Sequence, residues 1–161
     1  ARSHLGGLPP EVDLKAEVAL GNVVRALSAA DGPDGRPLVR AAHDLSNGGL
    51  VQSLVDSALR FGIGGTFDVA SAARRDCVGD HEMLLSESQA RAFVAVPEAA
   101  LKAVFAAAEA EGVDAVRIGT TGGDMLAISG VDLLAAEGEG CGWIASIDEL
   151  RELSETGRKH F

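Results

Sequence analysis

The chain has 161 residues, of which 47% are apolar and 24% charged, and its formal net charge is −10. These values predict a soluble globular protein of one domain with a sizeable core. The negative charge and the few aromatic residues (five Phe, one Trp and no Tyr) argue against nucleic acid as a partner, because such proteins need a cationic surface and stacking platforms. No stretch approaches the roughly twenty apolar residues that span a bilayer, and no signal peptide is visible, so we expect no membrane partner and a cytoplasmic location.

The first residues indicate a piece of a longer chain. The sequence opens with ARSHLGGLPP and has no initiating Met, so we expect residues 1–10 to be a connector and residues 11–161 to be the domain. Cys77 and Cys141 lie far apart and lack CxxC spacing, which supports neither a zinc site nor a disulfide framework.

The first elements along the chain are a helix, a turn and a short strand. Residues 11–30 carry an apolar stripe at helical spacing, with Pro10 suited to the first turn and Asp13 to the positive N-terminal end. The turn sequence DGPDGRP then ends this segment. Residues 38–42, LVRAA, predict a short strand that ends at His43.

The next predicted element is an amphipathic helix over residues 48–61, which Gly62 ends. Its apolar face includes Leu50, Leu54 and Ala58. Its polar face carries Gln52, Ser53, Asp56, Ser57 and Arg60. Residues 64–70, GGTFDVA, follow as a predicted strand.

Strands and a further helix are predicted after the polar stretch that follows. Two apolar strand pieces, 83–85 and 91–96, flank the polar insert SESQ. A helix begins at Pro97 and Glu98, and Gly112 closes it.

The last third of the chain predicts a hairpin and a closing helix. Residues 115–129 predict two strands around TGGD, and residues 131–145 are weakly patterned. Residues 146–161 predict a helix with a basic end, in which Ser146 and Glu149 match a capping box. The hairpin requires at least one antiparallel pair, so the predicted fold is a single α/β (α+β) domain with a mixed β-sheet and helices packed on it.

The stretch 43–49, HDLSNGG, is the strongest candidate for chemistry. It combines the carboxyl end of a strand, two glycines and a helix N-terminus, where open α/β sheets bind ligands. Free amides and the helix dipole attract anions there, and Gly48 and Gly49 let the backbone approach phosphate oxygens without an intervening Cβ. His43 can donate a hydrogen bond or a proton, and Asp44 can hold the loop or a Mg²⁺ ion.

The same stretch has a plainer interpretation. Ser46 or Asn47 would be an N-cap, and the glycines would only permit a tight turn. Because strand–turn–helix connections with Gly are common, the pattern alone favours this alternative. A Walker-type loop is excluded, since no Lys and Ser/Thr follow at the required spacing.

The second candidate is LLSESQARAF, residues 84–93. Ser86, Glu87 and Ser88 lie between apolar strand pieces, and Arg91 follows four residues after Glu87. A Glu in this place can coordinate a metal or orient an Arg toward phosphate. The alternative is a capped turn with a surface ion pair, which stabilises the fold little.

The two motifs together resemble a known family. AAHDLSNGGL and LLSESQAR, roughly forty residues apart and in this order, are similar to the C-terminal domain of the aminoimidazole-ribonucleotide-synthetase-related superfamily. Within it, the likeness is to the formylglycinamidine ribonucleotide synthetases of the multi-subunit type. The lead GGLPPEVDLKAE resembles the connector into their second C-terminal-type domain, and GTTGGDMLAISG resembles their closing hairpin. Relatives often carry Asp or Glu at position 47, so the uncharged Asn47 departs from the family pattern.

This resemblance implies a part of a larger enzyme that uses ATP, Mg²⁺ and ammonia in purine biosynthesis. It implies a catalytic role for His43 and a metal contact for Asp44. It implies substrate or phosphate binding by Asp44, Ser46, Asn47, Gly48, Gly49, Ser86, Glu87, Ser88 and Arg91. The implied partners are N-terminal-type domains of the same chain, a glutaminase subunit and a small accessory subunit. Because the N-terminal-type domains carry most of the metal- and nucleotide-binding acids, we expect this domain alone to require no cofactor and to be inactive.

Several alternatives remain open at this point. Other enzymes of the superfamily are aminoimidazole ribonucleotide synthetase, thiamine-monophosphate kinase and hydrogenase-maturation proteins. A different class is a non-catalytic domain that uses 43–49 as a turn and contributes an assembly surface. The resemblance is to the second of two domain copies, so the cleft is either the catalytic one or its pseudo-symmetric structural counterpart.

Overall fold

The computed structural model describes residues 11–76, 78–130 and 142–158. The predicted connector, both cysteines and the residues after 158 lie outside these ranges, as does most of the weakly patterned segment 131–145.

The described residues form an alternation of helices and short strands. The helical elements are α1 (Leu14–Ser28), α2 (Gly49–Phe61), α3 (Ala70–Asp76), α4 (Asp80–Leu85), the 3₁₀ turn η1 (Glu98–Ala100), α5 (Leu101–Ala110) and α6 (Ile147–Arg158). The strands are β1 (Ala41–Asp44), β2 (Gly65–Asp68), β3 (Ala92–Ala95), β4 (Gly119–Thr121), β5 (Met125–Ser129) and β6 (Gly142–Ser146).

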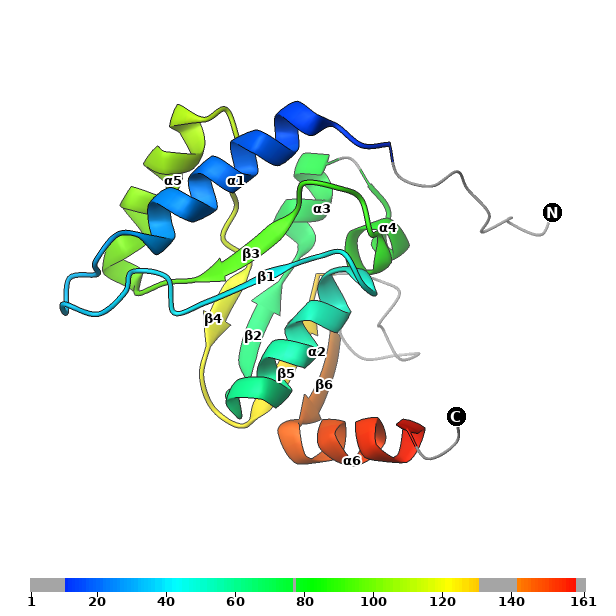
Figure 1. The fold of residues 1–161 in the computed structure, drawn as a ribbon. Coiled ribbons are helices and arrows are strands. Elements are labelled where there is room, and N and C mark those ends of the chain that lie inside the picture. Colours follow the sequence, from blue (N-terminus) through cyan, green and yellow to red (C-terminus); the bar gives the residue numbers. More distant parts are fainter. Residues whose placement is uncertain (1–10, 77, 131–141, 159–161) are drawn as a thin grey trace.

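Four of the strands form a mixed sheet in the order β4-β2-β5-β6. β2 runs parallel to β5 and antiparallel to β4, and β5 runs antiparallel to β6. β1 and β3 form a separate antiparallel pair. Figure 1 shows α2 lying across the larger sheet and α1 beside α5, next to the β1–β3 pair. The predicted fold class, an α/β domain with a mixed sheet and packed helices, is confirmed.

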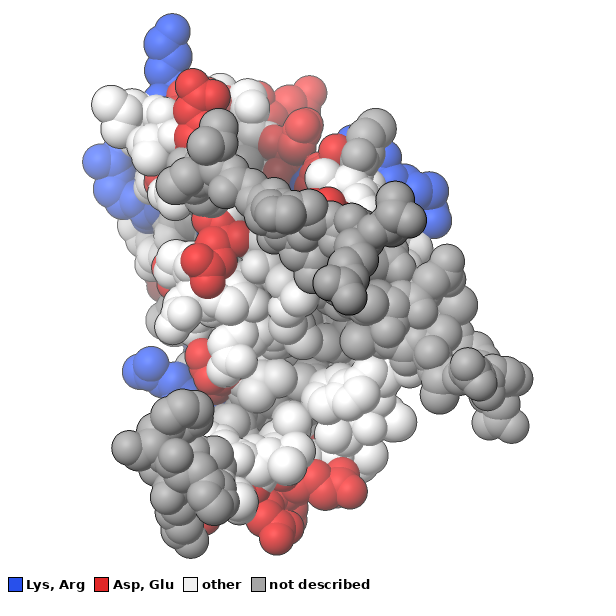
Figure 2. Space-filling model, turned by 90° about the vertical axis from the view of Figure 1, so that its right-hand side faces the viewer, with Lys and Arg blue, Asp and Glu red and all other residues white. Residues whose placement is uncertain are grey.

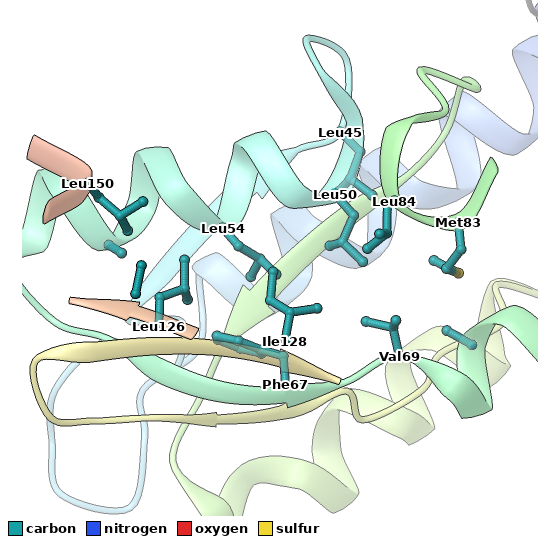
Figure 3. Packing of buried hydrophobic residues seen from close by; sticks show 13 residues of the cluster. Leu45, Leu50, Leu54, Phe67, Val69, Met83, Leu84, Leu126, Ile128 and Leu150 are labelled. Atoms are coloured by element: carbon teal, nitrogen blue, oxygen red, sulfur yellow. The ribbon is translucent and has the colours of Figure 1, made fainter. Parts of the chain in front are cut away.

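The main hydrophobic core lies between α2 and the four-stranded sheet (Figure 3). Leu50 and Leu54 of α2 pack in one cluster with Phe67 of β2 and with Leu126 and Ile128 of β5. Each of these side chains is less than a tenth exposed. The cluster fixes α2 on the sheet and therefore fixes the direction in which its first turn points. Within the described residues, every helix is too short or too polar to cross a bilayer.

Charged side chains are dispersed on the face drawn in Figure 2. Asp and Glu form several separate groups there, while Lys and Arg lie mainly at the margins. The excess negative charge is therefore spread over this face and not gathered in one acidic region.

The predicted helix at 11–30 is confirmed as α1, although it begins three residues later. Asp13 is its N-cap, and one carboxylate oxygen accepts the backbone N–H groups of Lys15 and Ala16 at 2.9 and 3.2 Å. Such a cap satisfies amides that have no partner inside the helix.

The other predicted helix ends are also confirmed. Gly62 follows α2 in a left-handed conformation (φ 64°), and Gly112 follows α5 in the same conformation (φ 68°). At the start of α6, the N–H of Ser146 donates to Glu149 Oε2 (2.8 Å) and the N–H of Glu149 donates to Ser146 Oγ (3.2 Å). This reciprocal pair is the predicted capping box.

Two strand predictions near the candidate motifs are wrong in part. β1 covers 41–44 instead of 38–42, because Leu38 is buried in the cluster between α1 and α5 and the pairing partner β3 reaches only residues 41–44. Residues 83–85 belong to helix α4. Met83 and Leu84 are both buried in the main core, whereas consecutive residues of a strand point to opposite faces.

The predicted hairpin at 115–129 is wrong. β4 and β5 follow each other in the chain, but β2 lies between them in the sheet. The TGGD loop passes over the start of β2, where Gly64 donates its N–H to Gly123 O and accepts the N–H of Gly122, both at 2.9 Å. The inserted strand comes from fifty residues earlier, so the local pattern does not reveal it. β6 was not predicted either, since it lies at the end of the weakly patterned segment.

Candidate functional site

His43 is held on one side and open on the other. Its ring stacks on Phe93 of β3, with centroids 6.0 Å and planes 19° apart. Its Nδ1–H donates to the carbonyl oxygen of Asp44 at 2.6 Å. This bond selects the tautomer in which Nε2 is the nitrogen that can accept a proton. The side chain is 35% exposed, so His43 combines a fixed ring with an available nitrogen.

Asp44 presents an ionised carboxylate at the end of β1. Its side chain is 66% exposed, and the Ser46 hydroxyl donates to its Oδ2. This hydrogen bond, assisted by the nearby His43 ring, holds the pKa of Asp44 below its ordinary value. Asp44 is thus an anionic group that can bind a metal ion or steady a protonated His43, whose Nδ1 lies 3.4 Å from Oδ1.

The turn into α2 depends on two left-handed glycines. Gly48 has φ 71° and Gly49 has φ 67°. A Cβ on Gly48 would lie 2.6 Å from Gln52 Cβ, and a Cβ on Gly49 would lie 2.7 Å from the backbone oxygen of Leu84. The first turn of α2 therefore sits directly against the backbone at the end of α4.

The plainer interpretation of this turn is wrong in its capping residue. Gly48 is the N-cap of α2, and as a glycine it makes no side-chain capping bond of its own. Ser46 bonds to Asp44 instead, and Asn47 is exposed. The amides of the first turn have no acceptor inside the helix.

The second motif supplies the partner of that N-terminus. Glu87 Oε1 accepts the backbone N–H of Gly48 at 2.8 Å. The structure thus joins two predicted motifs that lie 39 positions apart. The predicted alternative for this motif was a capped turn with a surface ion pair. Of these, an ion pair between Glu87 and Arg91 does not form.

Arg91 folds back and binds the SESQ segment that precedes it. Its guanidinium donates to Ser86 O at 3.3 Å, to Ser88 Oγ at 3.4 Å and to Met83 O at 3.4 Å. Among the described residues it forms no ion pair, and burial lowers the pKa of its half-buried guanidinium while the charge of Asp76 opposes that shift. An arginine nevertheless stays charged, so Arg91 is a cation that no carboxylate of the described residues pairs with.

A pocket of about 230 Å³ opens beside this cation. It is lined by Asp76, Val78, Glu82, Ser86, Ser88 and Arg91. The hydroxyls of Ser86 and Ser88 lie 2.9 Å apart, so two hydroxyls and a guanidinium face one space. A larger cleft of about 600 Å³ is lined by residues of α1, α2, α5 and both sheets. Its lining is mostly apolar but includes Arg40, Arg75, Arg91 and Arg117, whereas the hydroxyls of Ser86 and Ser88 line the smaller pocket.

Ser53 is a site residue that the sequence analysis misplaced. It was assigned to the polar face of its helix, but its side chain is fully buried, and its hydroxyl lies 2.8 Å from the carbonyl oxygens of both Asp44 and Gly49. Its spacing of three residues from Leu50 places it on the buried face, and this signal was available in the sequence. Asp76 and Glu82, which line the pocket, carried no signal that marked them.

The acidic residues of the site do not form a metal centre by themselves. Within the described residues, no three His, Cys, Asp or Glu side chains gather in a way that could hold a metal ion. Asp44 can therefore serve as one ligand of a metal ion, with other ligands coming from elsewhere.

Comparison with known proteins places this arrangement in a family. Residues 2–129 match the family model described as AIR synthase related protein, C-terminal domain. The chain belongs to this family. The predicted superfamily resemblance is thereby confirmed.

Relatives within this family share much of the sequence. The chain is 43% identical over 127 residues to the phosphoribosylformylglycinamidine synthase subunit PurL of a Nocardioides species, covering 79% of this chain and 15% of the relative. It is 40% identical over 154 residues to the subunit of the same name from Renibacterium salmoninarum, covering 96% and 18%. The chain thus spans less than a fifth of the length of these curated relatives.

A solved structure shares the fold of this family member. T. maritima PurL complexed with ATP superposes with a TM-score of 0.55 and 16% identity, covering 70% of this chain and 19% of that one. At this identity the likeness shows the fold alone.

The left-handed glycine in the family motif should be irreplaceable. Gly49→Ala should lower the free energy of unfolding by about 3 kcal/mol, because a left-handed L-residue costs about 1–2 kcal/mol and overpacking adds about 1–3. Gly62→Ala is the matched control, since Gly62 has φ 64° and open space around it, and it should lose only about 1 kcal/mol. Urea unfolding of both variants measures the difference, and equal losses would contradict the close packing of α2 on α4.

The ionisation of Asp44 should depend on Ser46. Because its pKa is lowered in the folded chain, the ionised carboxylate stabilises the fold above its ordinary pKa, and this contribution is lost as the pH falls through the lowered value. Ser46→Ala should move the pKa of Asp44 back up toward the ordinary value, so that the contribution of the ionised carboxylate to stability becomes smaller. A carboxyl NMR titration measures this shift. The pKa of Asp34, which a hydrogen bond from Arg40 lowers, should not change in the variant.

Proposed function

We propose that this chain is the C-terminal domain of a phosphoribosylformylglycinamidine synthase large subunit. In the complete enzyme it would form part of the substrate and nucleotide cleft for the ATP- and glutamine-dependent conversion of formylglycinamide ribonucleotide to formylglycinamidine ribonucleotide. The observation that carries this proposal is that the two motifs of the family resemblance meet in space through Gly48 and Glu87. The names of the two relatives above favour this synthase over other enzymes of the superfamily.

In this reaction the amide oxygen of the substrate takes the γ-phosphoryl group of ATP, and ammonia then displaces phosphate. Nε2 of His43 would exchange a proton with the reacting groups. The amides at the start of α2 after Gly48 suit phosphate oxygens, because the helix dipole adds to their hydrogen bonds. Arg91 and the hydroxyls of Ser86 and Ser88 suit a further anionic group of the substrate.

Magnesium fits this site only as a shared ion. Asp44 supplies one ionised oxygen ligand, and Mg²⁺ normally combines one or two carboxylates with phosphates and water. The other ligands would come from the nucleotide and from the N-terminal-type domains. ATP would supply the phosphoryl group, and a glutaminase subunit with a small accessory subunit would supply ammonia in the cytoplasm.

The catalytic role can be tested in the complete synthase. His43→Ala and Asp44→Asn should each lower kcat at least a hundredfold, the usual contribution of a positioned acid or base being about 10²–10⁴. The melting temperature should change little, because both side chains lie at least partly in solvent. Asp56→Asn, an exposed change on α2, is the control and should keep full activity. Normal kinetics with a lowered melting temperature would instead support a non-catalytic assembly domain.

The domain should not catalyse the reaction by itself. The 161-residue chain, mixed with formylglycinamide ribonucleotide, ATP, Mg²⁺ and ammonia, should release no phosphate above background, since most of the proposed nucleotide-binding groups belong to other domains. Phosphate release that His43→Ala abolishes would refute the proposal that other domains are required.

A further inference from the structure

Ala90 is a strained residue directly after the SESQ segment. Its backbone is left-handed (φ 55°), and no other non-glycine residue in the described part of the chain has a positive φ. An L-residue keeps this conformation only where its surroundings hold it. Ala90 immediately precedes Arg91, so its conformation sets the direction in which the chain carries Arg91 toward the pocket.

A carboxylate from a distant helix holds this residue. The backbone N–H of Ala90 donates to Glu17 Oε1 at 2.8 Å, across 73 positions of sequence. Glu17 lies in the first turn of α1, which Figure 1 shows beside the segment that joins α4 to β3. Among the described residues, no cation forms an ion pair with Glu17. Its partly buried carboxylate therefore has the Ala90 amide as its hydrogen-bond partner.

This bond is not needed to cap α1. Asp13 already accepts two amides of the first turn, so the helix has its cap without Glu17. The contacts of Arg91, by contrast, depend on the backbone conformation of Ala90, the residue before it. Its guanidinium bonds are long, at 3.3–3.4 Å, and its carbonyl oxygen accepts the N–H of Leu45 at 3.1 Å. At the turn itself, the hydrogen bond from the Ala90 N–H to Glu17 Oε1 is shorter, at 2.8 Å.

We propose that Glu17 is a positioning residue, which holds Ala90 in its left-handed conformation and so directs the Arg91 guanidinium into the pocket with Ser86 and Ser88. The inference rests on the proposed function only where it assigns a substrate to Arg91. It adds to the site a residue from α1, which neither sequence motif contains.

Hydrogen exchange in the 161-residue chain tests the bond. Glu17→Ala should raise the exchange rate of the Ala90 amide about ten- to hundredfold, the factor expected for losing a hydrogen bond to a charged group, and should shift the Arg91 Nε–H resonance. Glu17→Gln keeps an acceptor oxygen, so it should restore most of the protection. Glu109→Ala removes the same charge from the exposed face of α5, so it is the matched control and should leave both signals unchanged.

If Glu17→Ala does not fold, Glu17→Asp tests the same contact, because it keeps the charge and withdraws the oxygen by one methylene. Unchanged exchange at Ala90 in a folded Glu17→Ala or Glu17→Asp variant would overturn the inference.

Kinetics of the complete synthase test the consequence. Glu17→Ala should raise the KM for formylglycinamide ribonucleotide about tenfold, with kcat within about twofold, because positioning of a binding group is lost and the reacting groups are untouched. Glu17→Gln should recover most of the KM. Arg91→Ala should raise KM at least as much as Glu17→Ala.

The two proposals fail in different ways. An unchanged KM in Arg91→Ala would remove the substrate contact from the proposed function, while the exchange measurement would still decide the role of Glu17. A raised KM in Arg91→Ala together with an unchanged KM in Glu17→Ala would overturn the positioning role and leave the substrate contact intact.

Discussion

The contact between the first turn of α2 and the backbone at the end of α4 is the constraint on which the candidate site depends. It requires a glycine at position 49, because a Cβ on Gly49 would lie 2.7 Å from Leu84 O. The close approach brings the Gly48 amide to the carboxylate of Glu87. Both motifs of the site are therefore placed by a single packing contact, which the core beneath α2 keeps in position.

Several carboxylates in this acidic chain bind backbone amides. Asp13 caps α1, Glu149 closes the capping box of α6, Glu87 binds the start of α2 and Glu17 binds the turn at Ala90. Two of these contacts are local, and two join segments that are far apart in the sequence. Hydrogen bonds of this kind are stronger than neutral ones because the acceptor is charged. Part of the excess negative charge thus stabilises the fold by accepting hydrogen bonds from backbone amides.

An acidic domain can still present groups that suit anions, because such groups act locally. The groups proposed to bind anions at the site are helix amides, serine hydroxyls and the guanidinium of Arg91, which forms no ion pair among the described residues, and each acts over a short distance. Glu87 already occupies the Gly48 amide. An anionic ligand at the start of α2 would therefore bind the amides that follow Gly48. The predicted joint role of the Gly48 and Gly49 amides is thereby reduced to the amide of Gly49 and those after it.

The sequence by itself determined the main helices and their ends, and it marked the two motifs of the candidate site. Some features depend only on residues that are neighbours in the sequence, so they could be predicted without a structure. These are the helical periodicity, the capping box at Ser146 and the helix-ending glycines at 62 and 112. The motif residues also carried the family resemblance. Only the tertiary structure decided the strand order, because β2 enters between β4 and β5 from a distant part of the chain. It likewise decided that Glu87 reaches Gly48 and that Glu17 holds Ala90. These contacts arise when separate segments pack on one another, and no periodicity along the chain encodes which amide a distant carboxylate will meet.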